Sequence, residues 1–75
     1  MNLKQVNIKR AKLQGAMLTK AQLNEADLSN AILEGAALIH TNLCGANLEN
    51  ACLDGATLSD ARLDQATRTY ANQHK

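Results

Sequence analysis

Three residues have side chains suited to catalysis or to metal binding, namely His40, Cys44 and Cys52. His40 and Cys44 are four residues apart, a spacing that on a helix brings two metal ligands together. A cysteine beside a histidine is also the pair that nucleophilic catalysis uses. However, the sequence has no CxxC motif, no HxxxH motif and no glycine-rich phosphate loop, and no second histidine near His40 completes a zinc site. We therefore expect no enzymatic activity, no metal site and no cofactor.

Length and composition limit the class of protein. The chain has 75 residues, a net charge of +1, one tyrosine and no Phe, Trp or Pro. A chain of this length forms one domain, near the lower limit for a self-sufficient core. No apolar run approaches the ~20 residues of a membrane span, and nothing resembles a signal peptide. Two cysteines without a secretory segment indicate thiols in a reducing compartment, so we expect a soluble, cytoplasmic protein.

Leucine recurs at every fifth position. The stretch CGANLENACLDGATL places it at Leu48, Leu53 and Leu58, and every leucine in the chain lies on this register. Alanine stands two residues before the central position in most of the five-residue units, whereas Met1, Val6 and Thr41 are exceptions. All four glycines stand two residues after it. A period of five fits neither an amphipathic helix nor an unbroken strand, so the chain must bend once per unit.

The alanine and the central leucine of a unit explain how such a chain buries its apolar residues. Two residues apart on an extended segment, they point to the same side. If the chain turns the same way after each unit, it coils into a solenoid filled by alanine and leucine, and successive coils hydrogen-bond ~4.8 Å apart like parallel strands. Gly, Asn and Asp near the end of a unit suit the turn. The leucines predicted for the core are Leu13, Leu18, Leu23, Leu28, Leu33, Leu38, Leu43, Leu48, Leu53, Leu58 and Leu63.

The units ADLSN, ANLEN and ATLSD resemble the A(D/N)LXX units of the pentapeptide repeat family, over residues 1 to about 67. The resemblance implies an all-β fold, a right-handed quadrilateral β-helix with twenty residues per coil. Fourteen units, counted from the one centred on Leu3 to the one centred on Arg68, then give about three and a half coils, and the β-helix is expected over residues 1–67. Arg68 stands where a leucine belongs and is expected to end the core, which leaves residues 68–75 as a C-terminal tail.

With four units per coil, residues twenty apart stack in columns. We expect a flat column of Gly15, Gly35 and Gly55, a favourable column of Lys20, His40 and Asp60, and an amide and carboxylate ladder of Asn7, Asp27 and Asn47. Glu34 over Asp54 is a like-charge pair. Cys44 and Cys52 fall on opposite sides of the coil, which makes a disulfide between them geometrically unfavourable.

Some apolar residues occupy positions that point outward. These are Ile32, Ala37, Ile39 and Cys52, with Ile32 and Cys52 in one column above Lys12. Scattered surface apolar residues are normal in soluble proteins. If they gather with Cys44 on neighbouring faces, they form a contact patch instead. Glu34, Asp54, Ile32, Ile39 and Cys52 are the candidate partner-binding residues.

The small net charge hides a separation of charges along the chain. Residues 21–66 carry seven acidic residues and one basic residue, whereas residues 1–20 carry only basic ones. Some members of the pentapeptide repeat family are DNA mimics that occupy the DNA site of gyrase, a role that needs an acidic surface. The short chain and the basic first coil argue against that role, and charge runs are usually solvated faces.

We therefore predict a non-enzymatic protein-interaction or structural module that presents rigid faces to a protein partner. The alternative is a small DNA-mimic inhibitor of a DNA-handling protein, such as a topoisomerase or a defence enzyme, with the acidic middle as its site. We expect no membrane association and no direct nucleic-acid binding. Association of copies through the uncapped ends of the solenoid is a further expectation, and a fragment of a longer chain is also compatible with the sequence.

Overall fold

The computed structural model describes residues 1–66, and each five-residue unit in it ends in a tight turn. The carbonyl oxygen of the central residue accepts a hydrogen bond from the backbone N–H three residues later, as from Ala26 to Leu23 at 3.0 Å. In every turn of residues 1–66, the residue that precedes the N–H donor in the chain has a positive φ, between 57° and 75°. A positive φ at the third residue is the mark of a type II turn, which favours Gly or Asn there. Nevertheless, nine of these positions within residues 1–66 hold residues other than glycine.

Between turns, one residue of each unit pairs with the residue twenty positions along the chain. Within residues 1–66 these pairs are isolated parallel bridges, such as Gln22 with Asn42 and Ile32 with Cys52, and no longer strand or helix is formed there. The spacing of twenty shows that four units complete one coil. The number of sides predicted for the coil is therefore confirmed. The described residues make three coils and begin a fourth.

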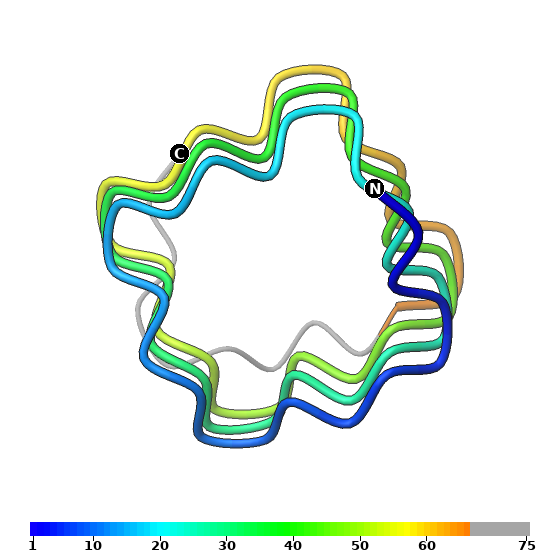
Figure 1. Ribbon diagram of the computed structural model, residues 1–75, viewed down its shortest axis with the longest axis horizontal. Coiled ribbons are helices and arrows are strands. Elements are labelled where there is room, and N and C mark those ends of the chain that lie inside the picture. Colours follow the sequence, from blue (N-terminus) through cyan, green and yellow to red (C-terminus); the bar gives the residue numbers. More distant parts are fainter. Residues whose placement is uncertain (67–75) are drawn as a thin grey trace.

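The coil has four sides, which we call A to D in chain order. Figure 1 shows them along the axis of the coil, with successive coils stacked behind one another. Side A contains residues 1–5, 21–25, 41–45 and 61–65; side B contains 6–10, 26–30 and 46–50; side C contains 11–15, 31–35 and 51–55; side D contains 16–20, 36–40 and 56–60.

Backbone hydrogen bonds join each coil to the next. The N–H of a central leucine donates to a carbonyl in the following coil, as from Leu23 to Asn42 at 2.8 Å. In the opposite direction, the N–H of Ile32 donates to the carbonyl of Ala11 in the preceding coil at 2.8 Å. These bonds satisfy backbone groups that would otherwise be costly next to an apolar interior.

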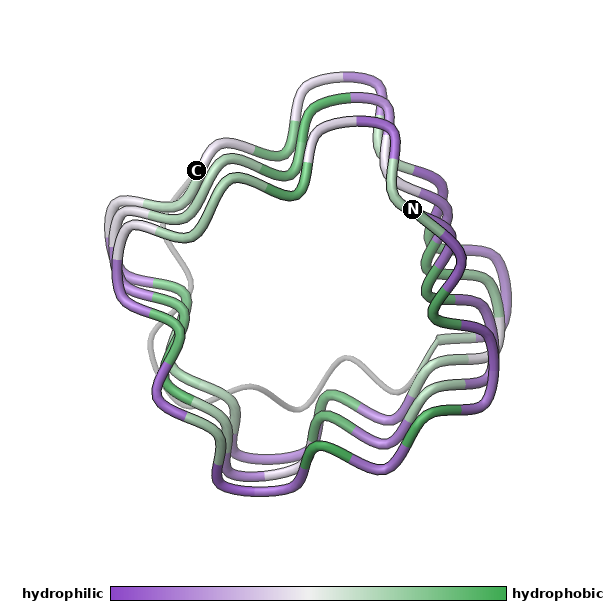
Figure 2. Cartoon of the chain, in the orientation of Figure 1, coloured by the Kyte–Doolittle hydropathy of each residue, from purple (hydrophilic) through white to green (hydrophobic). Residues whose placement is uncertain are grey.

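Alanine and leucine fill the interior, as the period of five predicts. In the middle of the structure the core side chains are 0–3% exposed, for example Leu28 and Ala31 at 0%. Figure 2 shows the apolar residues on the inner side of the coil and hydrophilic ones mainly at its outer corners. Leu13, Leu58 and Leu63 were predicted as core residues but are only partly buried against it. Their units lie near the two ends of the described coil, so the core covers them mainly from one side.

The predicted end of the core at Arg68 and the tail of residues 68–75 lie outside the described residues. The domain boundary after residue 67 therefore stays a prediction.

Candidate interaction surfaces

The three residues suited to chemistry lie on different parts of the coil. Cys44 is on side A and Cys52 on the opposite side C, and both are half-buried thiols. His40 lies at the corner after side D. Within residues 1–66, no three His, Cys, Asp or Glu side chains gather so as to hold a metal ion.

The column of Lys20, His40 and Asp60 forms as predicted from the twenty-residue coil. His40 Nε2 lies 3.7 Å from Asp60 Oδ2, with both side chains more than half exposed. An exposed pair of this kind contributes little to stability, because water and salt screen it. The glycine column forms as well: a Cβ built on Gly55 would lie 3.7 Å from the backbone nitrogen of Gly35.

The predicted ladder of Asn7, Asp27 and Asn47 needs a correction. The three residues do stack by parallel bridges. Each side-chain oxygen, however, accepts a hydrogen bond from the backbone N–H two residues later in its own unit, from Lys9, Ser29 and Glu49 respectively. A short Asn or Asp side chain reaches its own turn more easily than the next coil.

Asp27 is the carboxylate of this column, and it accepts two hydrogen bonds from Ser29. The Ser29 hydroxyl donates to Asp27 Oδ1 at 2.7 Å, and the Ser29 N–H donates to the same oxygen at 3.1 Å. These two hydrogen bonds, aided by the positive charge of Lys9 and opposed by partial burial, lower the pKa of Asp27 below its ordinary value of 3.8.

Side C holds four of the five candidate partner-binding residues. Ile32 is bridged to Cys52 above it and to Lys12 below it, as predicted, and Ile32 and Cys52 are half-buried. Glu34 and Asp54 are exposed beside them, and the Cys52 thiol donates to Glu34 Oε2 at 3.7 Å. The contact shows that the Glu34 side chain lies over side C.

The fifth candidate, Ile39, lies on side D with Ala37, and both are half-buried. The glycine corner separates these two residues from Ile32. The apolar outward residues therefore do not form one patch with Cys44 but divide between sides C and D, with Cys44 on side A. The sequence alone did not show how the side chains divide at that corner.

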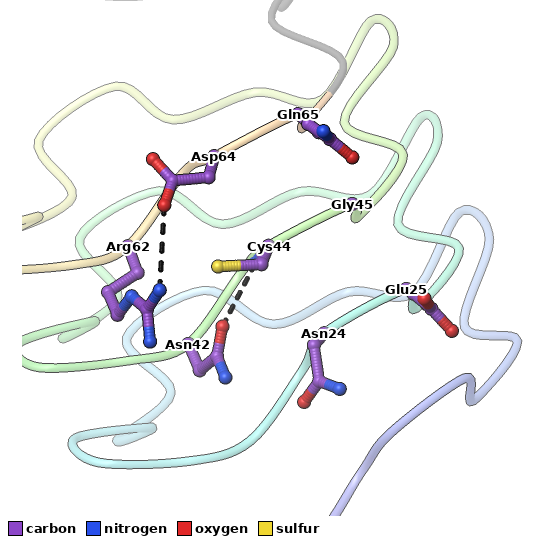
Figure 3. A pocket seen from close by; sticks show the side chains of 8 residues that line it. All are labelled: Asn24, Glu25, Asn42, Cys44, Gly45, Arg62, Asp64 and Gln65. Atoms are coloured by element: carbon purple, nitrogen blue, oxygen red, sulfur yellow. Dashed lines mark hydrogen bonds and ion pairs between the residues drawn. The ribbon is translucent and has the colours of Figure 1, made fainter.

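Side A carries a hollow that the sequence analysis missed. Gly45 is one of its lining residues, and the volume of the hollow is about 380 Å³. Figure 3 shows the Arg62 guanidinium directed at Asp64, 3.5 Å away, and the Cys44 N–H donating to Asn42 Oδ1 at 3.0 Å. The lining residues are Asn24, Glu25, Asn42, Cys44, Gly45, Arg62, Asp64 and Gln65.

Comparison with known proteins supports the repeat directly. The sequence matches the signature of the pentapeptide repeats in eight copies, over residues 1–35 and 31–67. The chain belongs to the pentapeptide repeat family. Members of this family are known to form a β-helix, and the four-sided coil of the structure fits that architecture. No curated protein is similar enough to count as a match to this pentapeptide repeat protein.

In the described part of the chain, no helix is long and apolar enough to cross a membrane.

Proposed function

We propose that this pentapeptide repeat protein is a non-enzymatic interaction module that binds another protein through side C. The observation that carries the proposal is the stacking of Ile32 and Cys52 at the centre of that side, between Glu34, Asp54 and Lys12. An apolar centre with a charged rim is the usual anatomy of a protein interface. We also take the coil to have the right-handed sense of the family. The cytoplasmic location inferred from the two thiols stays a prediction.

The coil suits this role because its outward side chains are held in fixed columns. Backbone hydrogen bonds join the coils of side C on both sides of Ile32, for example from Leu33 N–H to the Cys52 carbonyl at 2.7 Å. A surface that is already ordered loses little conformational entropy when a partner binds. Repeat solenoids therefore present binding surfaces in which the core stays regular and the outward residues set the specificity.

The alternative function is a DNA mimic that uses the acidic middle of the chain. The acidic residues of positions 21–66 are divided among the sides and corners of the coil, and the longest acidic column in the described residues is Glu34 with Asp54. A mimic has to present repeated negative charge to a basic channel. The short acidic column favours the interaction module.

The experiment is a capture of partners from source-cell lysate with three immobilised proteins: the unmodified chain, Ile32→Lys and Gln22→Lys. Gln22 is the matched control, because it holds the same position of its unit in the same coil but on side A. We expect a protein that the unmodified chain and Gln22→Lys retain and that Ile32→Lys loses. Equal capture by all three proteins would contradict binding through side C.

Elution separates the two functions. The bound partner is challenged in parallel with duplex DNA and with salt. A contact with an apolar centre resists both, whereas mimicry predicts release by DNA and a steep loss of binding with salt. Release of the partner by DNA, together with loss of binding in the double variant Glu34→Lys with Asp54→Lys, would replace the proposed function by mimicry.

A further inference from the structure

Side D differs from the other sides in having no charged side chain at the outward positions between its two corners. Two residues of each unit point outward over a side, as the bonds of Cys52 to Glu34 on side C and of Arg62 to Asp64 on side A show. On side D these residues are Met17, Thr19, Ala37, Ile39, Thr57 and Ser59. Within residues 1–66, the same positions carry charges on every other side, such as Arg62 on side A, Glu49 on side B and Lys12 on side C.

The two corners that bound side D are unlike each other. On one corner Gly15, Gly35 and Gly55 leave the backbone without side chains. On the other corner lies the charged column of Lys20, His40 and Asp60. It is positive at Lys20 in the first coil and negative at Asp60 in the third coil. Figure 2 shows side D at the upper left, in white and shades of green, between the pale glycine corner and the purple charged corner. Met17 is 79% exposed, so a large apolar side chain stands free in the monomer.

We propose that side D binds side D of a second copy, related by a twofold axis that runs along residues 36–40. Under this rotation, each residue faces the same position of a five-residue unit in the other copy. The first coil of one copy then faces the third coil of the other. Ala37 then faces Ala37, Ile39 faces Ile39, and Met17 faces the short Thr57 of the other copy. An isologous contact of this kind requires a self-complementary surface, and side D has one.

The charged corner selects this orientation. In the proposed dimer, Lys20 of each copy faces Asp60 of the other, and His40 faces His40. If the twofold axis ran along the coil axis instead, the charged column of each copy would face the glycine corner of the other, and no opposite charges would meet. Charge complementarity therefore fixes the register, as it does in many interfaces.

The contact is small and the dimer is accordingly weak. Three coils ~4.8 Å apart and five residues of ~3.3 Å each make a side of roughly 14 by 16 Å. The area per copy is well below the ~800 Å² of a standard interface. We therefore expect association only at about 0.1–1 mM protein, in the range of weak complexes.

Charge reversal tests the geometry by sedimentation velocity from 20 µM to 2 mM protein. Lys20→Asp places Asp against Asp60 of the other copy, and Asp60→Lys places Lys against Lys20, so each variant alone should associate at least tenfold more weakly than the unmodified chain. An equimolar mixture of the two variants should associate again, because opposite charges then meet across the contact. The double variant Lys20→Asp with Asp60→Lys should also associate, since the reversed column remains self-complementary.

Ala37→Glu tests the centre of the contact, with Gln22→Glu at the same position on side A as its control. We expect the first to abolish association and the second to preserve it, with unchanged far-UV circular dichroism for both. A monomer at 2 mM, or single charge reversals that associate like the unmodified chain, would overturn the dimer. Because side C stays outside the contact, the binding of a protein partner is tested independently of this result.

Discussion

Thr41 Oγ1 donates a 2.7 Å hydrogen bond to the carbonyl oxygen of Leu18, 23 residues earlier in the chain. Thr41 stands at an inward position that alanine fills in most other units, and it is 0% exposed. The Leu18 carbonyl also accepts the N–H of Ala21 at 3.0 Å. The core therefore holds a hydroxyl group whose hydrogen-bonding need is met by a carbonyl that the turn has already placed there.

Thr41→Val should destabilise the coil slightly. Valine keeps the volume but removes the donor, and the Leu18 carbonyl retains its bond from Ala21, so we expect a cost of about 1 kcal/mol. In a domain of this size that cost corresponds to a fall in melting temperature of about 4–8 °C. A thermal melt followed by circular dichroism measures it. An unchanged melting temperature would mean that the hydrogen bond contributes nothing.

Leu38→Lys should unfold the middle of the coil. Leu38 is 1% exposed, and a lysine there would place a charge in an apolar interior without a partner. A buried unpaired charge costs about 3–5 kcal/mol, a large part of the total stability of a small domain. Ala37→Lys is the control, because the neighbouring side chain points outward. If both variants melt at the same temperature, the division between inward and outward positions is wrong.

Gly45→Ala should cost more than Gly15→Ala. Both glycines have a φ near +70°, which costs an ordinary residue about 1–2 kcal/mol. A Cβ at Gly45 would also lie 3.2 Å from Glu25 Cγ, whereas nothing lies within 4 Å of one at Gly15. We expect an additional cost of about 0.5 kcal/mol at Gly45 from the displaced Glu25 rotamer. Urea unfolding of both variants, repeated with Glu25→Ala, should show the difference disappear when the glutamate is shortened.

Ser29→Ala should raise the pKa of Asp27 towards its ordinary value. The variant removes the hydroxyl bond, the main cause of the lowered pKa, and retains the backbone bond. A carboxyl whose pKa is lowered by folding stabilises the protein above its unfolded pKa, and that stabilisation is lost as the pH falls through the folded pKa. The gap in melting temperature between the unmodified chain and Ser29→Ala should therefore be wider at pH 7 than at pH 2. Carbon-13 NMR titration of the Asp27 carboxyl reads the pKa directly, and equal titration curves would contradict the assignment.

The period of five predicts much of this architecture. It separates inward from outward positions and places the turns, so the burial of Leu38 follows from it. The number of sides does not follow, because a period of five closes with three units as well as with four. The resemblance to the family supplied four sides, and the bridges between residues twenty apart confirm them.

The details that escaped prediction depend on short-range choices of individual side chains. Asn7, Asp27 and Asn47 bond to their own turns because that partner is nearer than the next coil. The hollow on side A depends on the rotamers of the side chains that line it. Spacing in the sequence does not contain this information.

The pairing of residues twenty apart also determines which changes in length the coil tolerates. Removing one whole coil, for instance residues 21–40, leaves every remaining residue on its own side and joins the basic first coil to the acidic later ones. Removing five residues keeps the leucines inside but moves every later unit to the neighbouring side of the coil. Each column therefore acquires new neighbours. A deletion of any number that is not a multiple of five places polar residues in the interior. Changes in chain length therefore act on this fold in discrete steps, of which the step of twenty preserves its surfaces and the step of five rearranges them.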